Sequence, residues 1–336
     1  MDRRHVGMLL TVCDLHLEFV GFDGIAKVLD GVSLRVKAGE KVGLVGESGC
    51  GKTVTMKSIL GILASPPARV TRGSILYKEW DILKVRKRGL PRVHGGGMSY
   101  VPQDPMSSLN PVFTIGTQMR DVLKYADAKL TGRRGKRSRL VAVEALARVQ
   151  LADPERLLKS YAFQLSGGMQ QRVLIAMGLL SHPELVIADE PGTALDVTIQ
   201  AQILEMLDAL VQEEGLALLI ITHNLGVVNT LVDWVYTMYA GSIVEEGPTA
   251  GVFAGPAHPY TKALIACVPK LAGGGIGRGI PGRVPSYFAA PSGCRFGPRC
   301  VCAFDTCGLR KPEMTGVREG PGHSAACFLL EQDRTA

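Results

Sequence analysis

The sequence has no long apolar run. Its longest run near the centre, residues 216–221, falls far short of the ~20 apolar residues that a membrane-spanning helix needs. Residues 1–5 lead straight into a strand-like alternation and lack the apolar core of a signal peptide. We therefore expect a soluble protein of the cytoplasm.

Aromatic residues are few, at 6% of the chain, and none is interleaved with the basic runs. The stacking platforms of single-strand binding are thus missing, so nucleic acid is not an expected partner. The formal net charge of +7 is partly clumped, in two runs: Lys84, Arg86, Lys87, Arg88 and Arg92, then Arg133, Arg134, Lys136, Arg137 and Arg139. These runs fit either solvated loops or surfaces attracted to an anionic membrane or an acidic partner.

Cysteine is sparse until the end of the chain. Cys13, Cys50 and Cys267 stand alone. The last 43 residues hold the other five: Cys294, Cys300, Cys302, Cys307 and Cys327. A cytoplasmic protein should not hold so many cysteines as disulfides, and such a cluster indicates a metal.

One strong motif is present at residues 46–53, which fit the phosphate-loop pattern G-x-x-x-x-G-K-[ST]. Residues 41–45 read as a strand and residues 52–63 as a helix, which disfavours the alternative of a glycine turn with an incidental lysine. Glycines let backbone N–H groups turn toward one anion, and the helix adds its positive end. Lys52 supplies charge for the outer phosphates and Thr53 a hydroxyl for Mg²⁺. We predict a nucleotide site formed by Gly46, Glu47, Ser48, Gly49, Cys50, Gly51, Lys52 and Thr53.

Strand-like segments surround this loop, at residues 9–19, 32–36, 73–77 and 98–101. Phe19 could stack on an adenine ring, or it could be a strand aromatic in the core. Helical periodicity dominates residues 106–182. There Ser166 can cap a helix whose first turn holds Gly167 and Gly168, which leaves N–H groups for a second anion, although Ser-Gly-Gly alone is more often a linker.

Residues 185–188 are apolar and lead to Asp189 and Glu190. An uninterrupted apolar run predicts a parallel strand buried on both faces, and ligands of α/β sheets bind at the carboxyl ends of such strands. Asp189 could hold Mg²⁺ or its waters, and Glu190 could deprotonate a water. The alternative is an ordinary acidic strand end. Helix 199–210, strand 217–222, His223 and a hairpin turning at residues 240–241 follow.

In this order and spacing, the motifs resemble those of the ATP-binding subunit of an ABC transporter, most closely the di- and oligopeptide (or nickel) importer branch. The match runs through residues 46–53, Gln103, residues 165–169 and 185–190, Asp196 and His223. The resemblance implies Phe19 near the adenine, Gln103 at the Mg²⁺, Glu190 as catalytic base and His223 at the γ-phosphate. It also implies that Ser166, Gly167 and Gly168 reach the nucleotide of the opposite subunit, with Asp196 in the loop at the dimer seam.

The resemblance implies an α/β fold: a P-loop NTPase core with antiparallel edge strands, a helical subdomain and a small C-terminal Cys-rich domain. We expect an ABC ATPase domain at residues 1–248, with its helical subdomain at about 105–183, and the C-terminal domain at 249–336. Two residues depart from the family pattern. Cys50 stands where serine is usual, and Gly192 stands where threonine or serine is usual, which could loosen the loop around Asp196.

The tail also resembles the importer branch, through residues 258–264 and the cysteines. Members with such a tail hold a [4Fe–4S] cluster, for which Cys294, Cys300, Cys307 and Cys327 take the family positions and Cys302 is spare. Four thiolates also suit zinc, although the intervals match no common zinc spacing, and free thiols are the third reading. Because the Mg²⁺–ATP ligands lie elsewhere, we expect loss of the metal to leave nucleotide binding largely intact.

The implied function is ATP hydrolysis that powers an importer from the cytoplasmic face of the bacterial plasma membrane. The implied partners are a second, paralogous ATPase subunit, two integral membrane permeases and an extracytoplasmic substrate-binding protein. A nickel importer and a soluble ABC ATPase of DNA repair or translation are the alternatives. Repair members carry a long coiled coil, and no heptad run is present here. Translation members usually fuse two ATPase cores, and this chain has one.

Overall fold

The computed structural model describes residues 7–85, 93–94, 96–126, 136–193, 195–268, 279–318 and 321–332. The chain forms two compact units. Unit 1 consists of Met1–Leu9, Lys37–Gly39 and Lys84–Ile220, and unit 2 of Leu10–Val36, Glu40–Leu83 and Ile221–Ala336. Each unit thus draws on segments far apart in the sequence.

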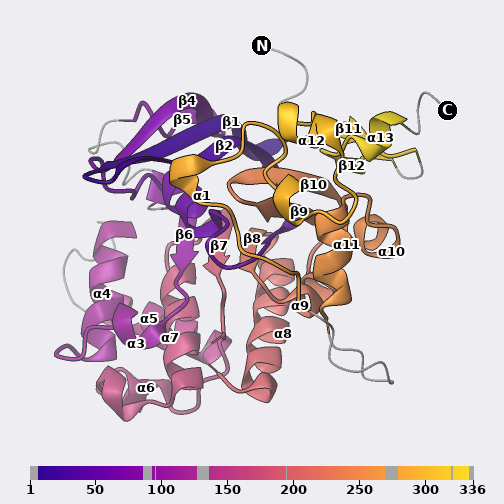
Figure 1. Cartoon of the computed structure of the whole chain (residues 1–336). Helices are drawn as coiled ribbons and strands as arrows, with labels where there is room; N and C mark the ends of the chain where they lie inside the picture. Colours follow the sequence, from indigo (N-terminus) through magenta and orange to yellow (C-terminus); the bar gives the residue numbers. More distant parts are fainter. Residues whose placement is uncertain are drawn as a thin grey trace. The chain divides into compact units, whose positions relative to one another are not determined.

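Unit 1 has a sheet edge of buried strands and a group of helices. Its strands are β6 (Met98–Val101), β7 (Leu185–Asp189) and β8 (Ala217–Thr222) as far as Ile220, and they lie side by side in that order. β6 and β7 are parallel, as the apolar run predicts. The helices are α3 (Pro105–Ser108), α4 (Ile115–Ala126), α5 (Lys136–Arg148), α6 (Pro154–Leu157), η2 (Ala162–Gln164), α7 (Gly167–Leu179) and α8 (Val197–Glu214). In Figure 1, α4, α5 and α7 lie together within this unit, in the stretch where the sequence predicts helices.

Unit 2 contains the phosphate-loop strand, β3, as the last strand of its own sheet segment. The strand order is β11 (Thr315–Gly316), β12 (Ser324–Ala325), β10 (Ser242–Pro248), β9 (Trp234–Tyr239) and β3 (Lys41–Val45). β3 pairs with β9 in parallel, whereas β9 and β10 form the predicted antiparallel hairpin. Helices α1 (Lys52–Ile59) and α9 (Leu225–Leu231) follow β3 and β8.

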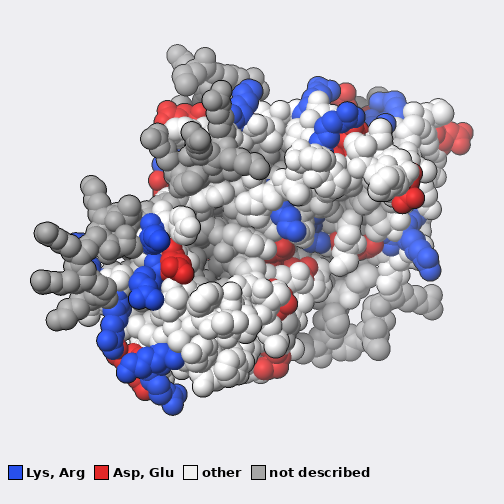
Figure 2. All heavy atoms as spheres, turned by 90° about the vertical axis from the view of Figure 1, so that its left-hand side faces the viewer, with Lys and Arg blue, Asp and Glu red and all other residues white. Residues whose placement is uncertain are grey.

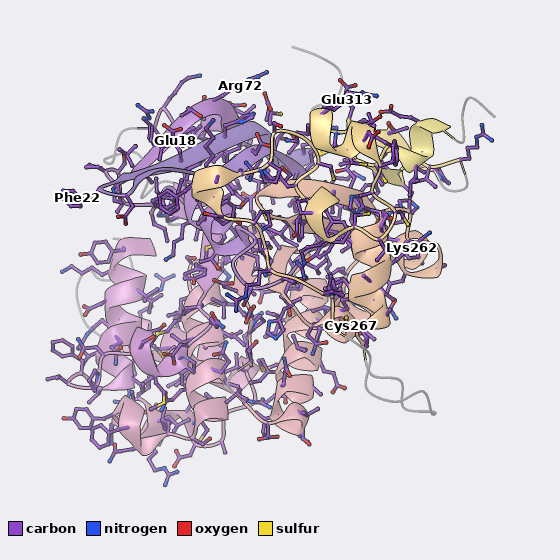
Figure 3. All side chains as sticks on the ribbon, in the orientation of Figure 1. Glu18, Phe22, Arg72, Lys262, Cys267 and Glu313 are labelled. Carbon is purple, nitrogen blue, oxygen red and sulfur yellow. The ribbon has the colours of Figure 1, made fainter. Side chains whose placement is uncertain are left out.

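A second, antiparallel sheet in unit 2 consists of β2 (Gly24–Lys37), β1 (Met8–Gly21), β4 (Ala68–Tyr77) and β5 (Trp80–Asp81) in that order. The predicted turn between β1 and β2 carries Phe22, which is fully exposed and points away from the strands (Figure 3). On the neighbouring strand pair, Glu18 of β1 forms an ion pair with Arg69 of β4. These are the antiparallel edge strands that the sequence predicts.

The last part of the chain packs onto the β9–β10 hairpin within unit 2. It comprises α10 (Thr249–Ala254), α11 (Pro259–Ala266), η3 (Tyr287–Ala289), η4 (Gly297–Arg299), α12 (Asp305–Leu309), β11, β12 and α13 (Leu329–Gln332). Tyr260 and Phe296 lie with Tyr239 in one buried cluster, whose ring centroids are 4.7–5.3 Å apart. Aromatic pairs at this spacing add stability beyond the area that they bury.

A buried carboxylate joins three segments beside this cluster. Glu245 of β10 has no exposed surface and accepts hydrogen bonds from the backbone N–H groups of Ala257 at 2.6 Å and His258 at 3.0 Å. Its third donor is the Nε2 of His323, at 2.7 Å. The side chain of His258 caps α11 by accepting from Tyr260 N at 3.0 Å, and burial lowers the pKa of His258 to about 3. One charged group thereby organises the start of α11 and the end of the chain.

Charged side chains on the described surface are mixed in sign. Lys and Arg gather toward the lower left of Figure 2, with Asp and Glu among them. Arg139 forms an ion pair with Glu155, and Arg156 lies 3.5 Å from Asp153. Of the two predicted basic runs, Arg86, Lys87, Arg88, Arg92, Arg133 and Arg134 lie outside the described residues. No helix in the described ranges combines the length and the apolar character that crossing a membrane takes.

Candidate functional site

The phosphate loop lies between β3 and α1 in unit 2, as predicted. Gly46, Gly49 and Gly51 all have positive φ, at 154°, 78° and 107°. A Cβ on Gly46 would lie 2.2 Å from the carbonyl oxygen of Met238, so no side chain fits there. Gly51 caps α1 without any side-chain hydrogen bond, which leaves the first N–H groups of the helix directed into the loop. The loop therefore has the form of a backbone anion cradle.

Lys52 and Thr53 differ in their surroundings. The Lys52 side chain is buried and its Nζ donates to the carbonyl oxygens of Gly46 at 2.8 Å and Glu47 at 3.0 Å, which closes the loop around the cation. Thr53 is exposed in the first turn of α1. Cys50 is fully buried, and burial raises the pKa of its thiol although Lys52 acts in the opposite direction. The substitution of cysteine for serine is thus accommodated as a buried, protonated group.

The predicted acidic pair lies in unit 1, at the carboxyl end of β7. Asp189 ends the strand and is buried, and Glu190 follows with a φ of 46°. Positive φ at a residue other than glycine is a form of backbone strain that concentrates at functional sites. Gln103, which follows β6, donates from its Nε2 to the Oε2 of Glu190 at 2.9 Å. Two of the three predicted catalytic side chains are therefore in direct contact.

The Ser-Gly-Gly segment starts α7, as its sequence predicts. Ser166 accepts a hydrogen bond from Met169 N at 3.3 Å, so it is the N-cap. The structure also gives the two glycines a packing role. A Cβ on Gly167 would lie 2.9 Å from Leu195, and one on Gly168 would lie 2.8 Å from Ile199 of α8. The helix start thus packs closely on the segment around Asp196.

Asp196 caps α8 by accepting from Ile199 N at 2.9 Å. Gly192 precedes it with a φ of 97°, a conformation that side-chain-bearing residues rarely adopt, and a Cβ there would lie 3.1 Å from Gln200. The loop therefore uses this glycine for its backbone path, and threonine could not simply replace it. In unit 2, Phe19 is half-buried on β1 and His223 is exposed just after β8.

The predicted nucleotide-site residues accordingly fall into two groups. Unit 2 contains Phe19, residues 46–53 and His223, whereas unit 1 contains Gln103, residues 166–168, Asp189, Glu190 and Asp196. Each group is coherent by itself: unit 2 supplies the phosphate cradle and unit 1 the acidic pair with its glutamine.

The tail cysteines come together in one pocket. Its lining includes Cys294, Cys300, Cys302, Cys307 and Cys327, together with His258 and the rings of Phe296, Phe304 and Phe328. Burial raises the pKa of Cys327 to about 11, and the thiols of Cys294, Cys300 and Cys307 act in the same direction. Within the described ranges, no group of three or more His, Cys, Asp or Glu side chains is arranged to hold a metal ion. In the described part of the chain, the five thiols therefore line one pocket, but they are not arranged as a metal site.

Sequence reasoning missed several side chains that contact the phosphate loop. Arg299 forms an ion pair with Glu47, with Nη1 to Oε2 at 2.9 Å. The Tyr260 hydroxyl accepts from Glu47 N at 2.9 Å, and the Tyr287 hydroxyl donates to Gly49 O at 2.6 Å. All three residues lie more than 200 positions from the loop, so no local pattern could reveal them. In the sequence, Tyr260 lies within residues 258–264 and Arg299 lies next to Cys300, but neither position points to the phosphate loop.

Comparison with known families gives two matches along the chain. Residues 29–193 match the family described as "ABC transporter". Residues 244–307 match the family described as "Oligopeptide/dipeptide transporter, C-terminal region". The first match covers the phosphate loop and the acidic pair, and the second covers Arg299 and three of the four predicted cluster cysteines.

Curated relatives align with almost the whole chain. A probable peptide ABC transporter ATP-binding protein of Sinorhizobium fredii is 44% identical over 324 residues, which are 96% of this chain and 95% of the relative. The dipeptide transport ATP-binding protein DppD of Bacillus subtilis is 40% identical over 96% of this chain and 95% of its own length. The oligopeptide transport ATP-binding protein AppD of the same organism is 41% identical over 97% and 98%.

Solved structures show the same fold. A dimeric ATP-binding cassette, MJ0796 bound to ADP and Pi, has a TM-score of 0.63 at 24% identity and covers 71% of this chain and 98% of its own. The cbiO1 protein of Clostridium perfringens, described as part of the ABC transporter complex cbiONQ, has a TM-score of 0.61 at 27% identity, over 74% and 91%. Together with the near full-length relatives, these matches place the chain: it belongs to the ATP-binding subunits of the ABC transporter family, in the branch with an oligopeptide/dipeptide transporter C-terminal region.

Proposed function

We propose that this ATP hydrolase powers the import of di- or oligopeptides. The observation that carries the catalytic part is the contact between Gln103 and Glu190, because a general base must be held in a defined orientation near the reacting water. The peptide specificity is supported by the match of residues 244–307 and by relatives named for peptide transport. The substrate itself is selected by the membrane and binding-protein partners.

The residues fit a Mg²⁺–ATP substrate. The exposed Thr53 hydroxyl, the Asp189 carboxylate and the Gln103 amide are oxygen donors of the kind that Mg²⁺ prefers. We assign the phosphates to residues 46–53, the adenine to Phe19, the γ-phosphate to His223 and the attacking water to Glu190. Ser166, Gly167 and Gly168 present their helix start to the nucleotide of a second subunit, with Asp196 beside them. When bound, Mg²⁺ neutralises charge that develops on the transferred phosphoryl group.

Glu190→Gln tests the catalytic assignment. The amide keeps the size of the carboxylate and its hydrogen bond to Gln103 but cannot take a proton, so turnover should fall by ~10² or more while ATP still binds. ATP-bound dimers should accumulate and be visible by size-exclusion chromatography. Glu213→Gln, on the exposed face of α8, is the matched control. Unchanged hydrolysis in the Glu190 variant would remove this residue from the mechanism.

We further propose that the subunit works with a paralogous ATPase, two permeases and an extracytoplasmic binding protein, at the cytoplasmic face of the bacterial plasma membrane. The chain alone should hydrolyse ATP slowly, because the second subunit supplies half of each site. Purification of a tagged chain from its native host should recover the permeases and the paralogue, and peptide should stimulate hydrolysis in the reconstituted transporter. Stimulation by nickel instead, or recovery without permeases, would contradict the peptide-importer assignment.

We propose that the C-terminal pocket holds a [4Fe–4S] cluster on Cys294, Cys300, Cys307 and Cys327. The fit rests on donor chemistry, since four thiols from separate stretches line one largely apolar pocket and such clusters are held by four cysteine thiolates. The cluster would fasten a small domain with little core of its own. Anaerobic purification with iron and sulfide analysis is the measurement. Cys300→Ser should lose the cluster and Cys302→Ser should keep it; one bound zinc would replace the assignment, and absence of metal would end it.

A further inference from the structure

Arg299 is saturated with hydrogen bonds. An arginine side chain has five N–H donors. Nε donates to Pro281 O at 2.8 Å, and the two terminal nitrogens donate to Ile280 O at 3.0 Å and to the Tyr239 hydroxyl at 3.3 Å. The remaining two N–H groups donate to the Glu47 carboxylate, at 2.9 and 3.3 Å. Only 5% of the Arg299 side chain is exposed. The contacts with Glu47 are therefore fixed by a rigid, buried fork.

Three side chains of the C-terminal part, at residues 260, 287 and 299, bind the phosphate loop. Arg299 binds the side chain of Glu47, Tyr260 binds the backbone N–H of the same residue, and Tyr287 binds the carbonyl of Gly49. The hydroxyl of Tyr287 is the donor in this bond, because the carbonyl oxygen of Gly49 can only accept. All three contacts are made to residues in the first half of the loop. Two of the four residues in this half, Ser48 and Gly49, are exposed.

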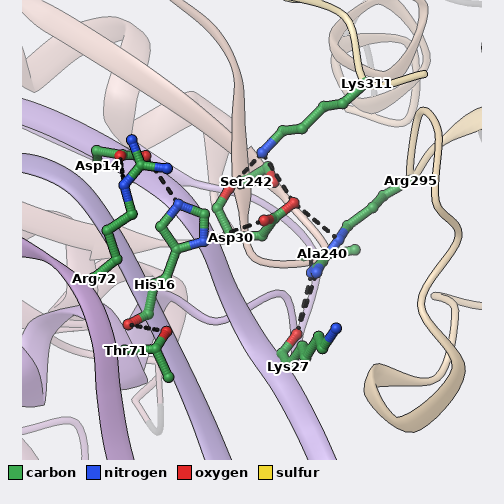
Figure 4. Close-up of polar contacts among 10 residues, drawn as sticks. All are labelled: Asp14, His16, Lys27, Asp30, Thr71, Arg72, Ala240, Ser242, Arg295 and Lys311. Atoms are coloured by element: carbon green, nitrogen blue, oxygen red, sulfur yellow. Dashed lines mark hydrogen bonds and ion pairs between the residues drawn. The ribbon is translucent and has the colours of Figure 1, made fainter.

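A second arginine, Arg295, supports the phosphate loop indirectly, through the β9–β10 turn. Arg295 donates to the carbonyls of Ala240 and Lys27 and lies 3.6 Å from Asp30 (Figure 4). Lys311 also binds Asp30, at 2.9 Å. The carbonyl of Ala240 belongs to the β9–β10 turn, whose next residue, Gly241, donates to Cys50 O at 2.8 Å. Arg295 thus holds the β9–β10 turn, and this turn contacts the second half of the phosphate loop through Gly241 and Cys50.

We propose that the segment from Cys294 to Cys300 positions the phosphate loop for nucleotide, with Arg299 as the main positioning residue. Arg295 and Arg299 lie immediately inside the two cysteines that bound this segment, so whatever fixes the cysteines also fixes both arginines. The proposal requires only that the loop binds nucleotide. It is independent of the transported substrate and of which metal the cysteines hold.

The expected change in the Kd for nucleotide depends on the fraction of molecules whose phosphate loop is in the binding conformation. If removal of the Arg299 fork leaves the loop in its binding conformation only about a tenth of the time, the apparent Kd for nucleotide rises about tenfold. The intrinsic contacts of Lys52 and the helix start with phosphate are unchanged by the substitution. The maximal hydrolysis rate at saturating ATP should therefore change much less than KM.

The test measures binding of a non-hydrolysable ATP analogue with Mg²⁺ to the full-length chain by titration calorimetry. Arg299→Ala should raise the Kd about tenfold, and Glu47→Gln should do nearly the same. The double variant should bind like either single one, because both remove one interaction. Tyr287→Phe, which removes a single hydroxyl and preserves the ring, should raise the Kd about twofold to tenfold. It serves as the test if Arg299→Ala does not fold.

Arg310→Ala is the matched control, because Arg310 lies in the same tail and forms an ion pair with Glu331, at 2.8 Å, away from the loop. It should keep the wild-type Kd. Wild-type affinity in a folded Arg299→Ala protein would overturn the proposal. So would an equal loss in Arg310→Ala, or multiplicative losses in the double variant, because either result would indicate general loosening of the tail.

Discussion

Replacing Glu245 with Gln should destabilise the protein by about 3–5 kcal/mol, and the estimate comes from the donors around the carboxylate. Oε1 accepts from Ala257 N and His323 Nε2, and Oε2 accepts from His258 N. If the amide oxygen of Gln takes the Oε1 position, its NH₂ group faces the N–H of His258. The buried N–H then lacks an acceptor, which costs about 1–3 kcal/mol. The other two bonds lose their charge assistance, at roughly 1 kcal/mol each.

The assay is equilibrium unfolding in urea, followed by tryptophan fluorescence and by circular dichroism. Glu246→Gln is the matched control on the same strand. Glu246 is partly buried and its pKa is raised, mainly by burial, so neutralising it should leave stability unchanged or slightly higher. A loss below about 1 kcal/mol in Glu245→Gln would refute the reasoning, because a fully buried carboxylate with three donors cannot be that dispensable.

Two further outcomes can be measured in the same way. Burial lowers the pKa of His258 to about 3, so below about pH 6.5 the unfolded chain binds a proton that the folded chain does not. The free energy of unfolding should therefore fall as the pH decreases, by about 2 kcal/mol between pH 6.5 and 5. His258→Asn keeps a cap on α11 and should lose this part of the pH dependence; an unchanged pH dependence would contradict the role given to His258. Gly192→Thr should destabilise the protein by about 1–2 kcal/mol, since it puts a β-branched residue at a φ of 97°, and an increase in stability would show that the loop readily adopts another path.

The parts of the fold that the sequence could predict are those with local signals. The bounds of β3, β6 and β8 agree with the predicted strands, because each is a short, mostly apolar run. The caps at Ser166 and Asp196 follow from short polar side chains before helical periodicity. The first helix is shorter than expected: it ends at Ile59, and Gly61 then takes a positive φ of 63°. Helical spacing alone could not reveal that end.

The parts that could not be predicted depend on contacts between distant residues. The expectation that metal loss leaves nucleotide binding intact treated the tail as a separate attachment. The contacts of Arg299 with Glu47 and of Tyr287 with Gly49 argue against that view. A buried arginine next to a cysteine looks in sequence like an ordinary surface cation, and only its partners give it a role. The backbone path at Gly192 was likewise hidden in the sequence, because only the structure shows that this glycine has a φ of 97°.

The way in which the tail is built into unit 2 has a consequence for anyone who prepares the protein. A shortened chain that stops at residue 248, where the ATPase domain was expected to end, would keep every phosphate-loop residue. It would nevertheless strip Tyr260 and Phe296 from the buried face of Tyr239 and leave Glu245 without its donors. Glu47 would lose its guanidinium partner. Such a fragment should aggregate or bind ATP poorly. A low ATP affinity measured on it would result from the truncation and would not be a property of the full-length protein.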